Sequence, residues 1–175
     1  QRADALMHVS QRLAARSGEI AQLITAENGK PLTWSRIEAS RGVSTFRWAA
    51  EEVRRWSGEL QRLDTDASAA GRIAMIRRFP HGPILGIAPF NFPLNLVAHK
   101  VAPALAVGAP VIIKPAPATP LTALVLGEIL AETDLPRGAF SILPATRDGS
   151  DLFTTDDRLK LLSFTGSPEV GWALE

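Results

Sequence analysis

One polar residue, Asn91, interrupts an apolar turn with the sequence Pro-Phe-Asn-Phe-Pro. Its side-chain amide can donate two hydrogen bonds without carrying a charge, which suits the stabilisation of an oxyanion that develops during a reaction. Asparagine is also a common N-cap, so Asn91 could instead cap a helix that is expected to begin near Pro93. The residue pattern by itself favours the cap over the chemical role.

Two lysines near this turn could also contact a ligand. Lys114 ends an apolar strand, where an ammonium group suits a hydroxyl or a phosphate of a nucleotide, although it could also extend from the core only to reach water. Lys100 follows Asn91 by nine residues in the next helix, which is about two and a half helical turns. A buried Lys100 would need a partner, and a structural ion pair is the simpler explanation. We interpret His99 as a core or surface histidine without a chemical role.

A glycine-serine turn occupies residues 166–171, which read GSPEVG between an expected strand and an expected helix. Backbone N–H groups at a helix N-terminus attract phosphate. The spacing matches neither of the common phosphate-binding glycine motifs, and no lysine follows it. From the pattern alone, a turn without a ligand is the simpler interpretation.

The segments around Asn91 and Lys114 read as strand, turn, helix and strand. Residues 83–88 and 110–114 are short apolar runs typical of strands buried on both faces, and residues 94–107 follow a helical pattern that ends at a glycine. Two parallel strands joined by a helix form a right-handed βαβ unit. Loops after the C-terminal ends of such strands bind ligands, so Asn91 and Lys114 are expected at one edge of the sheet.

The same alternation continues to the end of the chain and predicts an α/β fold, a parallel sheet with helices on its faces. The other expected elements are a leading helix up to residue 27, a helix at about 35–63, a polar loop at 64–71, an edge strand at 72–80, helices at 121–133 and 147–154, strands at 139–143 and 159–164, and a final helix from residue 168. The first two helices are candidates to pack on the sheet rather than to form a separate domain.

Composition excludes several classes of function. The 175 residues are 46% hydrophobic and 21% charged with a net charge of +1, which gives no indication of a nucleic-acid partner or a charged membrane surface. No apolar run reaches the ~18 residues that a membrane span needs. The chain has no cysteine, so it holds no disulfide, thiolate metal site or cysteine nucleophile, and its three histidines show no metal-ligand spacing. Both ends look cut, so we expect a piece of a longer protein.

Taken together in order and spacing, a set of motifs resembles the aldehyde dehydrogenase superfamily. The strong resemblance covers residues 83–171, and a looser one reaches back to about residue 19 through the Glu-Asn-Gly-Lys-Pro sequence at 27–31. The motifs that carry it are Pro89-Phe90-Asn91-Phe92-Pro93, Lys100, the sequence PALA at 103–106, Gly108, Lys114-Pro115, Thr119-Pro120 and Phe164-Thr165-Gly166-Ser167.

The resemblance implies a doubly wound, Rossmann-like cofactor domain and the oxidation of an aldehyde to an acid with NAD or NADP. In the family a cysteine thiolate attacks the aldehyde, a hydride passes to the nicotinamide, and a glutamate activates water. By position, Asn91 would hold the oxyanion and Lys100 would lie near it. The residues assigned to the cofactor are Ala88, Pro89 and Phe90 beside the nicotinamide, Lys114 and Pro117 at the adenosine ribose, Gly166 and Ser167 at the pyrophosphate, and Thr165 in the same turn.

Position 117 bears on the choice of cofactor. Members of the family that prefer NAD often carry a glutamate there, which binds both ribose hydroxyls and would repel a 2′-phosphate. Pro117 removes both effects, so we expect NADP, or both cofactors, to be used. The loop at 145–148 lacks the family's usual glycines; its Arg147 could reach a 2′-phosphate, although a surface arginine is the simpler interpretation.

The resemblance also implies that the chain is incomplete. Residues 1–175 would form most of a cofactor-binding domain, with a helical lead-in at 1–63 and βα units at 72–175, while the catalytic domain, with its cysteine and glutamate, would lie beyond Glu175. The parent would be a cytoplasmic homo-oligomer that acts on a small aldehyde without a metal, and the fragment alone would be inactive. A non-catalytic nucleotide-binding or scaffold module is the alternative, and the acyl-CoA-forming and phosphate-reducing branches of the superfamily remain open.

Overall fold

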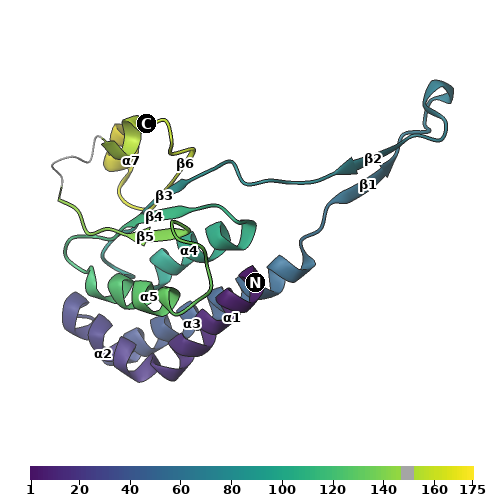
Figure 1. Cartoon of the computed structure of the whole chain (residues 1–175). Coiled ribbons are helices and arrows are strands. Elements are labelled where there is room, and N and C mark those ends of the chain that lie inside the picture. Colours follow the sequence, from purple (N-terminus) through teal and green to yellow (C-terminus); the bar gives the residue numbers. More distant parts are fainter. Residues whose placement is uncertain (147–151) are drawn as a thin grey trace.

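The computed structural model describes residues 1–146 and 152–175 and is built around a four-stranded sheet (Figure 1). Its strands pair in parallel in the order β5-β4-β3-β6. Each is a short run rich in branched or aromatic side chains, which favour strands; β3 and β4 are the most buried, whereas Leu161 and Leu162 of β6 are exposed. Their bounds are β3 Ile84–Ile87, β4 Val111–Lys114, β5 Phe140–Ile142 and β6 Leu161–Phe164.

The strand order places a topological switch point between β3 and β6. From β3 the chain adds β4 and then β5 on one side, and it returns to pair β6 with the other edge of β3. Connections that leave in opposite directions from neighbouring strands open a crevice at the C-terminal edge of the sheet. The turns that follow β3 and β6 border this crevice.

Helices cover the sheet in layers (Figure 1). Helices α4 (Asn95–Val107) and α5 (Leu121–Ala131) pack against one face, and α1 (Arg2–Ala15), α2 (Ser17–Asn28) and α3 (Leu32–Arg55) form a second layer beneath them. The last helix, α7 (Pro168–Leu174), lies on the opposite side of the sheet, and the short α6 spans Leu152–Thr155. The predicted α/β fold, with a Rossmann-like parallel sheet flanked by helices, is confirmed.

The apolar core lies between the sheet and helices α1 to α5. The inner face of α3 consists of Ser35, Glu38, Ala39, Gly42, Phe46 and Ala50, which lie along one side of a helix. Glu38 is the one charged member of this stripe, and it is almost fully buried. A buried carboxylate is costly unless it is paired, so Glu38 is expected to have ion-pair or hydrogen-bond partners.

Gly42 sets the distance between α3 and α4. A Cβ atom added there would lie 2.8 Å from Cδ2 of Leu94, a fully buried side chain just before α4. We therefore expect Gly42→Val to lower the free energy of unfolding by about 1–3 kcal/mol through overpacking. Gly18→Ala is the matched control, because nothing lies within 4 Å of its Cβ position and alanine favours helix by up to about 1 kcal/mol. Chemical denaturation would measure both, and an unchanged stability in Gly42→Val would contradict the close approach.

The prediction was wrong at two places in the first eighty residues. The leading helix is divided at Arg16 into α1 and α2, and both helices pack against α3. The second helix ends at Arg55 instead of continuing to residue 63, because the chain then enters β1 (Glu59–Arg62), which pairs antiparallel with β2 (Ile73–Ile76). Gly58 allows this change of direction, since a Cβ there would lie 2.1 Å from the carbonyl oxygen of Ile76.

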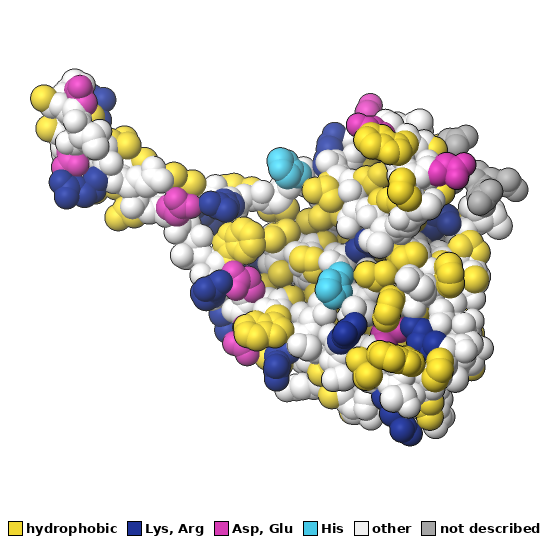
Figure 2. Space-filling model, turned by 180° about the vertical axis from the view of Figure 1, so that it is seen from behind, with side chains coloured by type: hydrophobic (Ala, Val, Ile, Leu, Met, Phe, Trp, Pro, Cys, Tyr) yellow, Lys and Arg dark blue, Asp and Glu magenta, His cyan; other side chains and the backbone are white. Residues whose placement is uncertain are grey.

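The β1–β2 hairpin extends away from the body of the molecule (Figure 1). The polar loop predicted at 64–71 is its tip, which contains the 3-10 turn Ala67–Ala69, and the predicted edge strand pairs only within the hairpin. Leu60 and Met75, which are 69% and 76% exposed, are among the apolar side chains along it (Figure 2). Residues 147–151, where a short helix was expected to begin, lie outside the described residues. In the described part of the chain, no helix combines the length and apolar character that a membrane crossing requires.

Candidate functional site

Three groups of predicted site residues meet at the C-terminal edge of the sheet. In register, the last residue of β3, Ile87, lies opposite Lys114 on one side and Phe164 on the other. The N–H of Ala88 donates to the carbonyl oxygen of Lys114 at 3.2 Å, and the N–H of Thr165 donates to that of Ile87 at 3.1 Å. The turn that carries Asn91, the end of β4 and the turn after β6 are therefore neighbours at the switch point.

The side chain of Asn91 does not cap α4. The helix begins at Asn95 without a side-chain cap from the preceding residues. Instead, the N–H groups of Leu94 and Asn95 donate to Oε1 of Glu38 at 2.9 and 3.1 Å. Asn91 is exposed, and its amide makes no hydrogen bond to the described residues. The cap favoured by the sequence pattern is therefore wrong, and the amide is available to a ligand.

The backbone of this turn is held by side chains from other elements. Nδ2 of Asn28 donates to the carbonyl oxygen of Phe90 at 2.7 Å, and Oγ1 of Thr119 donates to the same atom at 3.3 Å. Nζ of Lys30 donates to the carbonyl oxygen of Asn91 at 2.5 Å. Each contact fixes a backbone carbonyl and leaves the side chain of Asn91 free.

Lys30 and Glu38 form a buried ion pair beneath the turn. Nζ of Lys30 lies 2.6 Å from Oε2 of Glu38 and 4.3 Å from the ring centre of Phe92. The side chains are 13% and 0% exposed. The Glu38 carboxylate thus accepts from one ammonium and two backbone N–H groups, which compensates for its removal from water.

The Glu-Asn-Gly-Lys sequence at 27–30 supplies most of these contacts. Oε2 of Glu27 accepts from the N–H of Leu121 at 2.8 Å, and its Oε1 also accepts from Thr122, so Glu27 caps α5. Gly29, with φ of 79°, ends α2 in the left-handed conformation that glycine adopts most easily. The sequence motif alone did not predict these contacts, nor the role of Glu38, whose only signal is that it is an acidic residue on the buried stripe of α3.

Lys100 is buried at 6% exposure and joins α4 to the turn after β6. Its Nζ donates to Oγ1 of Thr165 at 2.8 Å, and burial lowers the pKa of its ammonium group. Its stem lies against β3, where a Cβ on Gly86 would be 3.1 Å from Cδ. The ion pair suggested as the simpler explanation is not found among the described residues, because the partner is a hydroxyl. His99 is exposed on the same helix.

The residues assigned to the cofactor lie at the same edge with different exposures. Lys114 is half-buried, and its ammonium has no hydrogen-bond partner within the described ranges. Pro117 is exposed in a turn. Ala88 is buried, Pro89 is half-buried, and Phe90 is 60% exposed.

The turn after β6 is open to solvent at its tip. Gly166 and Ser167 are both exposed, and Thr165 is half-buried. Oγ of Ser167 accepts from the N–H of Val170 at 3.4 Å and caps α7, which begins at Pro168 as predicted. A Cβ on Gly166 would lie 2.4 Å from the ring of Phe164, so a larger residue here would displace that ring.

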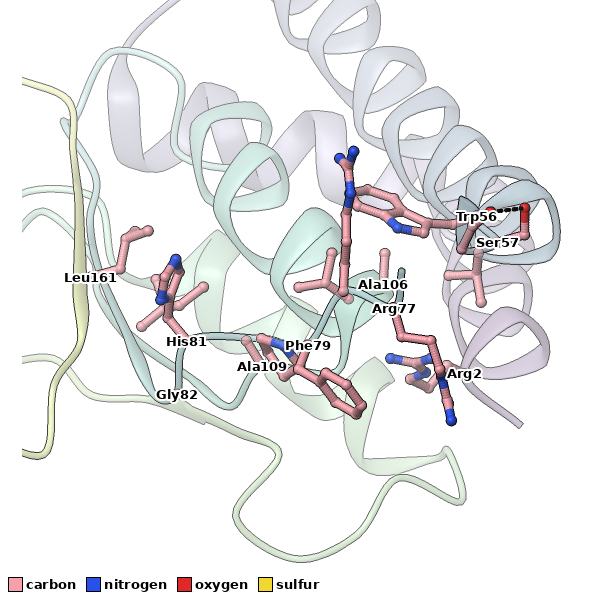
Figure 3. Close-up of a pocket in the computed structure, with 16 residues that line it drawn as sticks. Arg2, Trp56, Ser57, Arg77, Phe79, His81, Gly82, Ala106, Ala109 and Leu161 are labelled. Atoms are coloured by element: carbon pink, nitrogen blue, oxygen red, sulfur yellow. Dashed lines mark hydrogen bonds between the residues drawn. The ribbon is translucent and has the colours of Figure 1, made fainter. Parts of the chain in front are cut away.

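The pocket in Figure 3 lies away from the predicted site residues. It has a volume of about 570 Å³ and lies at the opposite, N-terminal edge of the sheet, near Gly82, Ala109 and Leu161. Arg77 and Phe79 belong to its wall, but none of the predicted site residues does. Asn91, Lys100 and Lys114 all lie away from this pocket, at the switch-point edge. Over residues 1–146 and 152–175, no three histidine, aspartate or glutamate side chains are grouped so that they could hold a metal ion.

Comparison with known proteins decides the family. The model of the aldehyde dehydrogenase family matches residues 1–174. The chain belongs to the aldehyde dehydrogenase family. Among curated aldehyde dehydrogenases, the 3-sulfolactaldehyde dehydrogenase of Priestia aryabhattai is 37% identical over 174 residues, which are 98% of this chain and 36% of the relative. The chain thus spans about a third of the length of the relatives it matches.

Solved aldehyde dehydrogenases share the fold closely. Aldehyde dehydrogenase 21 from Physcomitrella patens, in complex with the reaction product succinate, is 52% identical with a TM-score of 0.95 over 99% of this chain and 36% of that one. An NADP complex of a glyceraldehyde-3-phosphate dehydrogenase from Bacillus halodurans is 32% identical with a TM-score of 0.92, covering 99% and 37%. An NAD-dependent enzyme from Sinorhizobium meliloti is 27% identical with a TM-score of 0.91, covering 99% and 34%.

Proposed function

We propose that this chain is the part of an NAD(P)-dependent aldehyde dehydrogenase that binds the nicotinamide cofactor and supplies the oxyanion donor Asn91. The observation that carries the proposal is the free amide of Asn91, presented at the switch-point edge while Glu38 occupies the capping position it would otherwise fill. Residues 1–175 would form an incomplete cofactor-binding domain, with 1–63 as its lead-in and 72–175 as its βα units. The nucleophilic cysteine and the general-base glutamate would lie elsewhere in the protein.

The proposed role of Asn91 follows from the charge that develops on the aldehyde. When a thiolate adds to the carbonyl carbon, the carbonyl electron pair moves onto oxygen. An N–H of the Asn91 amide donates a hydrogen bond to that oxygen and stabilises the negative charge without transferring a proton. The bond of Lys100 to Thr165 fixes the turn after β6 relative to α4.

The residues at this edge fit a dinucleotide. The half-buried ammonium of Lys114 is free to bind ribose hydroxyls, and the exposed Gly166-Ser167 turn can approach a pyrophosphate. Ala88, Pro89 and Phe90 would border the nicotinamide, which when bound supplies the hydride acceptor. Thr165 would line the same crevice. Relatives with NADP and with NAD both share this fold, so a nicotinamide cofactor is supported, and the lean towards NADP rests on Pro117.

We propose a small aldehyde as the substrate. Succinate semialdehyde belongs in a test panel because the Physcomitrella patens enzyme, at 52% identity, was solved with succinate. A soluble, cytoplasmic homo-oligomer remains our expectation for the whole protein.

The test is turnover by the full-length protein on an aldehyde panel with each cofactor. We expect one acid and one reduced cofactor per aldehyde consumed. The alternative is a non-catalytic nucleotide-binding or scaffold module with the same fold. Cofactor binding without turnover of any aldehyde, in a well-folded full-length protein, would support that alternative.

Cofactor choice gives a separate prediction. Pro117→Glu should shift the ratio of kcat/KM values towards NAD by about 5- to 30-fold, which corresponds to the 1–2 kcal/mol of a hydrogen bond to a charged group. The added carboxylate gains ribose contacts and repels a 2′-phosphate. Lys114→Ala should weaken both cofactors, and NADP more.

Pro117→Ala is the matched control, because it removes the ring without adding charge and should leave the preference near that of the parent. The measurement is kcat/KM for each cofactor in the parent and the three variants. A parent enzyme strongly selective for NAD would mean that another part of the pocket decides the choice.

A further inference from the structure

We propose that Lys30 and Glu38 are positioning residues for Asn91: their buried ion pair fixes both ends of the segment from Asn91 to α4 and thereby holds the amide in its working orientation. This inference rests on the proposed role of Asn91 as an oxyanion donor. It assigns a function in the reaction to two residues of the α2–α3 corner, which lies outside the sheet.

The first end of the segment is fixed by Lys30. Its ammonium donates to the carbonyl oxygen of Asn91 at 2.5 Å and to Glu38 at 2.6 Å, and it faces the ring of Phe92 at 4.3 Å. Because the carbonyl belongs to Asn91 itself, a shift of Lys30 would turn the peptide group between Asn91 and Phe92, and with it the side chain of Asn91.

The second end is fixed by Glu38. Its Oε1 accepts from Leu94 and Asn95 while its Oε2 accepts from Lys30, so one carboxylate joins the start of α4 to the residue that holds Asn91. The same contacts use the N–H groups that a neighbouring asparagine could otherwise cap. Glu38 therefore also keeps the Asn91 amide from being drawn onto the helix.

Stability alone does not account for this arrangement. Burying two charges costs desolvation energy, and well-packed apolar residues in place of a buried pair are often as stable or more so. Both partners here reach backbone atoms between residues 91 and 95, and they orient that segment in a way that apolar side chains could not. This placement points to positioning as their role.

The test measures kcat in the full-length enzyme for Lys30→Met, Asn91→Ala and the double variant. We expect Lys30→Met to lower kcat by about 10-fold or more, since misplacement of a catalytic group by 1 Å can cost up to 10²-fold, with cofactor affinity changed by less than about 2-fold. In the Asn91→Ala background Lys30→Met should cause little further loss, because the group it positions is gone. A merely structural role would give losses that multiply.

Glu38→Gln should behave like Lys30→Met, and Lys30→Arg, which keeps the charge, should recover part of the lost rate. The matched control is Glu132→Gln, which breaks the exposed 2.7 Å pair with Arg12 between α1 and the end of α5 and should leave kcat unchanged. If Lys30→Met does not fold, Lys30→Arg takes its place with the same double variant and an expected loss of a few-fold.

The outcomes separate the two proposals. If Asn91→Ala lowers kcat but the folded Lys30 variants keep the parental rate, or if their losses multiply with that of Asn91→Ala, the positioning role is wrong and the proposed function stands. If Asn91→Ala itself keeps the parental kcat, the proposed role of Asn91 fails, and the positioning role fails with it.

Discussion

Asn91→Ala in the full-length enzyme is expected to lower kcat by about 10²- to 10³-fold, the usual cost of removing one oxyanion donor. Asn91→Asp should be at least as harmful, because it places a negative charge beside the developing oxyanion. The measurement is kcat at saturating aldehyde and cofactor, together with cofactor affinity, which should change little because the amide acts on the aldehyde oxygen.

The aspartate variant separates the chemical role from a structural one. Aspartate caps helices about as well as asparagine, so a residue that only capped α4 would tolerate the change with nearly full turnover. The structure argues against a cap, since Glu38 accepts the N–H groups at the start of α4. Full turnover in Asn91→Asp would overturn the oxyanion assignment.

The purified 175-residue chain should show no aldehyde oxidation with either cofactor. It contains no cysteine, so no thiol is present to form the covalent intermediate on which the reaction depends. The loss should be complete within detection, in contrast to the graded effects of the variants. The assay follows reduced cofactor over time with the same aldehyde panel as the full-length protein.

Inactivity of the chain is informative only if the chain is folded. Circular dichroism should show the helical content expected from α1 to α5, and the full-length protein assayed in parallel serves as the positive control. Cofactor-dependent turnover that remains with the purified chain through further purification would mean that a different nucleophile operates and that the proposed division of the enzyme is wrong.

Much of the sheet could be predicted because its signals are local. Residues 83–114 combine two short apolar runs with a glycine-terminated helix, and the structure places β3, α4 and β4 there. The hairpin could not be predicted in the same way. Leu60 and Leu63 continue the helical spacing of α3, but Gly58 and the pairing of β1 with β2 override that pattern.

Predictions at the site failed for the same reason: contacts between residues far apart in the sequence override the local pattern. The sequence pattern assigned Asn91 a cap because no local residue competes for the role, whereas the group that caps α4 is Glu38, 56 residues before Leu94. The partner of Lys100 is Thr165, 65 residues later, and it is a hydroxyl where a carboxylate was expected. Contacts of this kind depend on packing between α3, α4 and β6, which periodicity does not encode.

The most direct measurement is a crystal structure of the full-length enzyme trapped with an aldehyde in the absence of cofactor, so that hydride transfer cannot follow addition. Our account predicts that Nδ2 of Asn91 lies about 2.7–3.1 Å from the oxygen derived from the aldehyde, with Lys30 still bound to the Asn91 carbonyl. A separation beyond about 4 Å, or an amide turned onto the N–H groups at the start of α4, would contradict it.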